Sequence, residues 1–227
     1  MDIHDYAEEL ESAFLRLKDC CDISPRNKEL IEKFAQQLLI RCYSNPRVAK
    51  YLDTAQRVAR TFNKDYDKWT ADDMQNYLSW VQKRCRSPWT VQWYKVFIRR
   101  LMQWLNNMEG NEYPAIVAKI KINFGKNLLK LPNEGELLNH EEVQKVVAAC
   151  KNSRDRAFVA TLYESGCRIS ELGNLCMKHL TFDQYGVILT VSGKTGSRQV
   201  RVINAVQYLA AWQTDHPQKL NKDAPLW

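Results

Sequence analysis

The sequence predicts a mainly helical protein of two domains, a helical bundle followed by an α+β domain that carries a small antiparallel β-hairpin. Up to about residue 107, amphipathic segments follow one another with helix-start signals between them. Residues 109–138 are then interrupted by glycine and proline, and further helical segments lead to two β-branched runs. With 227 residues, 45% of them hydrophobic, the chain can build two separate cores.

The first predicted helix covers residues 2–21 and carries an apolar stripe with steps of four and three. Such a stripe fits a coiled-coil seam between protomers, or packing on the helix's own domain, which we favour. Ser24-Pro25 ends this helix. The stripe consists of Ile3, Ala7, Leu10, Phe14, Leu17 and Cys21.

Four more helices are predicted in the first domain, each from a capping residue or a proline at its start. They begin after Pro25, at Ser44-Asn45-Pro46, at Thr70 and at Ser87-Pro88, and the last runs to about Asn107. The last helix interleaves aromatic residues with Lys95, Arg99 and Arg100. An amphipathic core helix with solvated cations explains this pattern, and so does a surface that binds a polyanion.

The segment that follows is basic and loosely patterned, which is typical of an interdomain linker. Its lysines are Lys119, Lys121, Lys126 and Lys130. A basic linker beside a polyanionic partner would add salt-sensitive affinity, whereas a solvated connector would need no partner.

The second domain begins near Leu138, where an N-cap signal precedes Glu141 and Glu142. We predict helices over 141–151, 153–165 and 170–177, the last opened by Ser170. A short strand near 179–182 and a hairpin with strands near 187–191 and 199–203 follow. Asn204 is expected to cap a last helix.

Composition restricts the function. The net charge of +7 and pI near 9.0 favour a polyanionic partner. No apolar run is long enough to cross a bilayer, and the acidic N-terminus does not fit a signal peptide. We therefore expect a cytoplasmic protein without membrane contacts. Its seven cysteines are expected to be reduced and buried, and its four scattered histidines indicate no metal site.

The most informative stretch runs from Tyr163 to Leu172. An apolar helical run stops at Gly166, and Arg168 follows at once, with Glu171 near the positive end of the next helix. A guanidinium held at such a corner suits two-pronged recognition of a phosphate. A surface arginine paired with Glu171 explains the same residues, and both readings stay open here.

The predicted hairpin places Lys194 near its tip, between two β-branched arms. Gly193-Lys194-Thr195 also resembles the end of a phosphate-binding P-loop. We reject that reading, because the required first glycine falls at Ile188 and a strand rather than a helix follows Thr195.

Taken together, Arg154–Ala157, Glu164–Leu172 and Gly193–Arg198 resemble the tyrosine recombinases, the phage-integrase and Xer-like DNA strand-exchange enzymes. The similarity runs from about Ser24 to Trp227 and points to integrases of archaeal viruses or plasmids. It implies a core-binding domain with a SAM-like helical bundle and the first part of a catalytic domain. The expected boundaries are 1–24 for an N-terminal helix, 25–108 for the core-binding domain, 109–137 for the linker and 138–227 for the catalytic domain.

The resemblance also implies the chemistry. In this family a tyrosine attacks the phosphodiester and forms a 3′-phosphotyrosyl link, without cofactor or metal. Arg168 would stabilise the transition state, Lys194 would give a proton to the leaving oxygen, and Glu171 would support Arg168. The partner would be a duplex recombination or attachment site, on which the full-length protein would act as a homotetramer. Expected DNA contacts are Arg47, Lys50, Trp93, Lys95, Arg99, Arg100, Arg198 and the four linker lysines.

The family's His-x-x-Arg motif and nucleophilic tyrosine have no counterpart here. His216-Pro217-Gln218-Lys219 lacks the arginine, and Tyr208 lies in an apolar helical pattern that indicates core packing. We therefore expect a C-terminally truncated recombinase that is inactive alone. The alternative is a DNA-binding fragment that never cuts and acts as a regulator or competitor. A helical module that binds only proteins would leave Arg168 and Lys194 unexplained.

Overall fold

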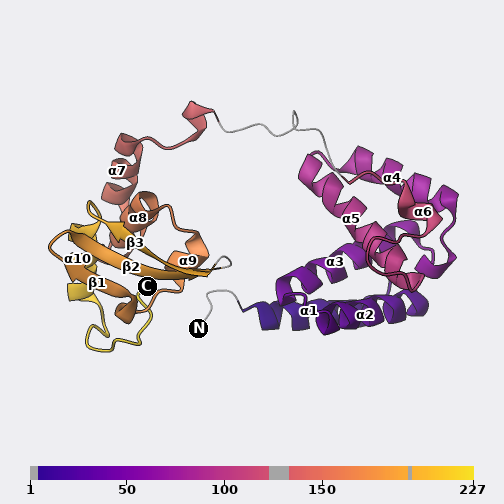
Figure 1. Ribbon diagram of the computed structural model, residues 1–227, viewed down its shortest axis with the longest axis horizontal. Coiled ribbons are helices and arrows are strands. Elements are labelled where there is room, and N and C mark those ends of the chain that lie inside the picture. The colour runs from indigo at the N-terminus through magenta and orange to yellow at the C-terminus, as the bar shows by residue number, and fades with distance from the viewer. Residues whose placement is uncertain (1–4, 123–132, 194–195) are drawn as a thin grey trace. The chain divides into compact units, whose positions relative to one another are not determined.

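The computed structural model describes residues 5–122, 133–193 and 196–227. They form two compact units, which we call the helical unit (up to residue 122) and the sheet unit (from residue 133). Each is shown in Figure 1 and is described by itself. The helices of the helical unit are α1 (Tyr6–Asp19), α2 (Pro25–Ile40), α3 (Asn45–Phe62), α4 (Ala71–Arg84), α5 (Pro88–Leu105) and α6 (Ala115–Ala118), with a 3₁₀ turn, η1, at Tyr66–Lys68.

The helix starts follow from local chemistry that the sequence displays. The Ser24 hydroxyl accepts a hydrogen bond from the Asn27 N–H, and Pro25 occupies the first turn of α2. Thr70 and Asp73 form a reciprocal capping box at α4. The mainly helical bundle predicted for this part of the chain is therefore confirmed.

The stripe on α1 packs within its own unit. Leu10 and Leu17 are buried in the core, where α1 lies against α3, and Phe14 between them is half-buried against that core. Ala7 and Cys21 at the ends of the stripe are exposed, and Ile3 lies outside the described residues. Burial of the central positions favours intramolecular packing over a seam between protomers.

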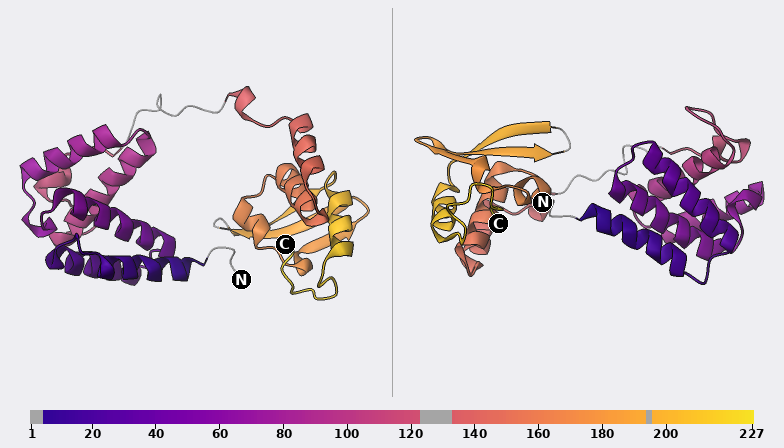
Figure 2. Two further views of the ribbon diagram at one scale, coloured as in Figure 1. Left: turned by 180° about the vertical axis from the view of Figure 1, so that it is seen from behind. Right: turned by 90° about the horizontal axis from the view of Figure 1, so that it is seen from below.

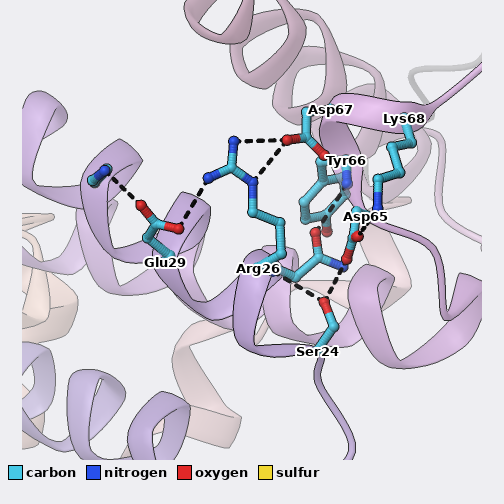
Figure 3. A network of polar contacts seen from close by, with 9 residues as sticks. Ser24, Arg26, Glu29, Asp65, Tyr66, Asp67 and Lys68 are labelled. Atoms are coloured by element: carbon cyan, nitrogen blue, oxygen red, sulfur yellow. Dashed lines mark hydrogen bonds and ion pairs between the residues drawn. The ribbon is translucent and has the colours of Figure 1, made fainter.

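A network of polar contacts joins the start of α2 to the turn before α4 (Figure 3). Arg26 binds Glu29 at 2.9 Å and Asp67 at 2.8 Å, and Ser24 donates to Asp65 at 2.6 Å. Lys68 binds the other carboxylate oxygen of Asp65 at 2.8 Å. Arg26 and Lys68 are therefore neutralised by carboxylates of the same chain.

Part of the expected linker belongs to the helical unit. Val117 of α6 has no exposed surface, and Pro114 before it is also buried. Gln103 of α5 holds the preceding loop by donating to the carbonyls of Gly110 and Glu112. The prediction of a linker that begins at residue 109 is therefore wrong for residues 113–120, because their apolar side chains pack into the core of the bundle.

The sheet unit packs helices against one face of a three-stranded antiparallel sheet, in the order β1-β2-β3 (Figure 2). Val187, Leu189, Val191 and Val202 point into its core, where they meet buried Leu209 of α10. The strands are β1 (Leu180–Asp183), β2 (Gly186–Gly193) and β3 (Gly196–Val202). The helices are α7 (His140–Ala149), α8 (Ser153–Ser165), α9 (Ile169–Gly173) and α10 (Val206–Asp215), with 3₁₀ turns at Glu134–Glu136 and Met177–His179.

Two predicted helix starts are wrong. Ser170 lies inside α9, and Arg168 occupies its N-cap position. Asn204 does not cap α10, whose N-cap residue is Ala205. The Glu164 carboxylate instead accepts the N–H groups of Ile203, Asn204 and Ala205 at 2.7 to 3.0 Å. A carboxylate distant in sequence thus satisfies backbone donors that a local side chain was expected to serve.

The cysteines are free thiols, but the prediction that they are buried holds only for Cys167. Cys21 and Cys42 are exposed, and the other four are half-buried. Within the described part of the chain, no helix is long and apolar enough to span a membrane.

Candidate functional site

The centre of the candidate site is a corner between α8 and α9. Gly166 ends α8 in the left-handed conformation (φ +57°), and its N–H donates to the Leu162 carbonyl at 3.2 Å. This backbone conformation is open to glycine at little cost, which is why the helix ends here. The chain then turns sharply, and Arg168 stands at the start of α9 with 59% of its side chain exposed.

Glu171 lies under this corner with only 1% of its side chain exposed. Its Oε2 accepts the backbone N–H of Arg168 at 3.1 Å, and its Oε1 accepts Nη1 of the same residue at 2.8 Å. The first bond caps α9, and the second holds the guanidinium against the corner. Arg168 therefore forms the ion pair with Glu171 that one reading of the sequence proposed, while most of its side chain stays exposed.

The hairpin reaches the same carboxylate. Arg198 of β3 donates from Nη1 to Glu171 Oε1 at 3.1 Å and from Nη2 to Oε2 at 2.8 Å. Gly193 of β2 passes so close that a Cβ atom there would lie 2.4 Å from Glu171 Oε1. Only a residue without a side chain permits this approach. Glu171 thus accepts four N–H bonds, two from each arginine.

These donors hold the pKa of the Glu171 carboxyl at about 2. The largest cause is the pair of bonds from Arg198, followed by the Arg168 N–H, while burial acts in the opposite direction. The same contact raises the pKa of Arg198. One buried carboxylate and two guanidinium groups leave the cluster with a net positive charge at neutral pH.

The structure thus brings together Arg168, Glu171 and Arg198. Arg198 was expected to contact DNA, but the structure places its two terminal nitrogens on Glu171. Lys194 lies outside the described residues. Sequence reasoning missed the Arg198–Glu171 contact, although strand alternation carried a signal for it, since Arg198, Val200 and Val202 share one face of β3.

A second group of candidate residues lies on α3 and α5 of the helical unit. Lys50 places its ammonium 4.2 Å from the centre of the Trp93 ring, and the Trp93 Nε1–H donates to Thr54 Oγ1 at 2.9 Å. The Arg47 guanidinium lies 4.7 Å from the centre of the Tyr43 ring. Aromatic faces thus hold these cations in place, and the polar group of Trp93 is already bonded within the protein.

The cations of α5 are more enclosed. Arg99 stacks on Tyr113 at 3.8 Å from the ring centre, and its buried Nε finds no hydrogen-bond partner among the described residues. Arg100 donates to Gln103 at 2.8 Å, and Lys95 is half-buried. Arg99 and Arg100 therefore also hold the loop between α5 and α6.

Sequence reasoning did not select Arg57, which lines a groove between α1, α3 and α5 together with Lys50, Thr54 and Trp93. Its helical spacing from Lys50 and Thr54 gave the signal, because residues three or four apart share a face. Among the described residues, none of these α3 and α5 cations forms an ion pair with a carboxylate. They are Arg47, Lys50, Arg57, Lys95, Arg99 and Arg100.

The remaining candidates are dispersed. Lys119 and Lys121 are exposed just after α6, whereas Lys126 and Lys130 lie outside the described residues. His216 is buried, accepts the Gln218 N–H through Nδ1 at 3.0 Å and contacts the Pro225 carbonyl through Nε2 at 3.0 Å. Tyr208 packs against the core of the sheet unit. Tyr208 thus has the packing role that the sequence indicated, and hydrogen bonds hold His216 within the sheet unit.

Within the described part of the chain, no group of three or more His, Cys, Asp or Glu side chains is placed to hold a metal ion. The site at the corner between α8 and α9 is built from two arginines and one buried carboxylate.

Residues 136–224 match the model of the phage integrase family. The chain is 22% identical over 188 residues to tyrosine recombinase XerA of Saccharolobus solfataricus, covering 78% of this chain and 60% of that protein. It is 27% identical over 174 residues to XerA of Pyrococcus horikoshii, with 77% and 55% covered. The chain therefore spans less than two thirds of the length of these relatives.

Among solved structures, the chain resembles the XerH site-specific recombinase bound to palindromic difH substrate in a post-cleavage complex. The TM-score is 0.63 at 16% identity, over 97% of this chain and 65% of the other. At this identity the likeness concerns the fold, and it agrees with the helical bundle and α+β unit predicted from the sequence.

Proposed function

The chain belongs to the tyrosine recombinase family, and from this premise we propose that it acts in site-specific DNA recombination. It would bind a duplex recombination site and contribute to an active site that cuts one strand through a 3′-phosphotyrosyl link. The reaction would run in the cytoplasm, on a homotetramer assembled on DNA.

The observation that carries this proposal is the arrangement of Arg168. Glu171 binds one of its terminal nitrogens, and 59% of the side chain is exposed. A guanidinium that is fixed at one side and open at the other can donate two parallel bonds to a phosphate. Cleavage adds negative charge to that phosphate, and a preorganised cation stabilises the added charge without reorganising.

The unpaired cations of α3 and α5 would bind the DNA backbone, together with the lysines after α6. Lys194 would give a proton to the leaving 5′ oxygen, since it follows Gly193 directly at the hairpin arm that covers Glu171. Trp93 would act by holding Lys50, because its own N–H is bonded to Thr54.

Because no His-x-x-Arg motif follows the hairpin in this sequence, we propose that the 227-residue chain alone forms no covalent adduct. The test uses a nicked duplex on which a 3′-phosphotyrosyl product cannot religate, followed by a denaturing gel. An adduct formed by this chain would contradict the proposal, and a Tyr208→Phe variant would then show whether Tyr208 is the nucleophile.

A chimera separates the recombinase from the non-cutting competitor. In it, a segment with the family's His-x-x-Arg motif and tyrosine follows Trp227. Adduct formation that falls roughly 10²–10³-fold in Arg168→Lys would support the recombinase, since lysine keeps the charge but loses the two-pronged donor. Normal DNA binding without any adduct would favour the competitor.

A further inference from the structure

We propose that Arg198 is a positioning residue that holds Glu171 with two bonds, so that Arg168 keeps donors free for a phosphate. This inference rests on the proposed function and deepens it. It assigns Arg198 to the support of Arg168 rather than to a direct phosphate contact.

The register of the hairpin directs Arg198 toward Glu171. Arg198 pairs with Val191, and Val200 pairs with Leu189. Cross-strand partners point to the same face, and Val191 and Leu189 are fully buried. Arg198 therefore continues the inward face of β3, and Gly193 continues the inward face of β2. Glu171 lies at the end of the two rows of apolar side chains that β2 and β3 direct into the core.

The contacts are unequal between the two arginines. Both terminal nitrogens of Arg198 bind Glu171, one to each oxygen, at 3.1 and 2.8 Å. The side chain of Arg168 uses Nη1 alone, at 2.8 Å. Arg198 thus satisfies both oxygens of the carboxylate, and Arg168 is left with its Nη2 and Nε donors.

Removing Arg198 would change how the oxygens of Glu171 are shared between the two arginines. A carboxylate with 1% of its side chain exposed cannot be left without partners at low cost. Among the described residues, Arg168 is the other cation already bonded to it, and this arginine would turn inward to bind both oxygens. Its donors would then be withdrawn from a phosphate, although Arg168 itself is unchanged.

A direct phosphate contact by Arg198 predicts a different pattern. It would act independently of Glu171, and its loss would add to the loss of Arg168. Under our proposal the effects of the two arginines are not additive, and a neutral residue at position 171 removes the need for Arg198.

The first measurement is the affinity of the chain for duplex DNA as a function of salt. Arg198→Ala should make the negative slope of log K against log salt shallower by about 0.9, the value for one phosphate contact. Adding Arg168→Ala to Arg198→Ala should change the slope no further, and adding Glu171→Gln instead should restore the wild-type slope. The matched control for Glu171→Gln is Asp183→Asn. It removes an equal charge on the outer side of the sheet, where Asp183 pairs with Arg201, and it should not restore the slope of Arg198→Ala.

The second measurement needs no DNA. Phenylglyoxal modifies accessible arginines, and mass spectrometry of peptides gives the rate at Arg168. The rate should fall in Arg198→Ala, recover when Glu171→Gln is added, and lie between these values in Arg198→Lys, which keeps the charge without the fork. If Arg198→Ala does not fold, the comparison of Arg198→Lys with wild type decides.

An unchanged Arg168 rate in the Arg198 variants would overturn the inference. The inference would also be overturned if Arg198→Ala made the salt slope shallower and adding Glu171→Gln failed to restore it, because Arg198 would then bind phosphate itself. If the wild-type chain shows no salt-dependent DNA binding, the proposed function fails, while the modification rates still decide the role of Arg198.

Discussion

The unpaired cations of α3 allow a quantitative prediction about DNA binding. Arg47 and Lys50 lie on aromatic rings and form no ion pair with a described carboxylate. If each contacts a phosphate, the double variant Arg47→Ala/Lys50→Ala releases two fewer counterions. The slope of log K against log salt should then become shallower by about 1.8.

This change has a measurable size. Between 50 and 200 mM salt, wild-type affinity should fall about 12-fold more than that of the double variant, which is a fourfold salt range raised to the power 1.8. Fluorescence anisotropy with a labelled duplex at four or five salt concentrations gives both slopes.

The matched control is Arg26→Ala/Lys33→Ala. It also removes one arginine and one lysine from the helical unit, but both bind Glu29, at 2.9 and 2.6 Å. Because these cations are neutralised within the protein, the slope should stay that of wild type. Equal changes in the two double variants would refute the reasoning, since the effect would then report net charge rather than a DNA-binding face.

Three further predictions concern stability. The pKa of Glu171 is about 2 in the folded chain and close to 4.3 when unfolded, so its bonds stabilise the fold above about pH 4.3. This stabilisation is lost as pH falls toward 2, and the difference in Tm between wild type and Glu171→Gln should shrink over that interval. In a urea titration, Gly166→Ala should lower the free energy of unfolding by about 1 kcal/mol, since the backbone is left-handed while no atom of the described neighbours crowds the added methyl. Gly166→Asn should cost less in the same urea titration, and equal costs would contradict the backbone explanation. Leu10→Asp should destabilise the chain by at least about 2 kcal/mol, whereas Leu15→Asp, at a side chain 52% exposed, should have little effect. Sedimentation that shows dissociation of an oligomer in Leu10→Asp would instead support the protomer seam.

The sequence by itself determined the order and type of most elements. Thr70 and Asn139 cap the helices that they were expected to cap, because the capping bond joins residues three apart in the chain. Periodicity of 3.6 and 2 gave the bundle and the hairpin. Gly166 and Arg168 were found for the same reason, since a helix end and its next residue form a local motif.

The tertiary structure alone decided which distant groups meet. Glu164 rather than Asn204 satisfies the start of α10, and residues 113–120 fill the core of the bundle instead of linking two domains. Arg198 binds Glu171 across 27 residues of chain. Such contacts depend on which strand face meets which helix, and residues far apart in sequence carry no local trace of their partner. The sequence thus determined where the cations are, and the fold decided which are neutralised and which remain open to a phosphate.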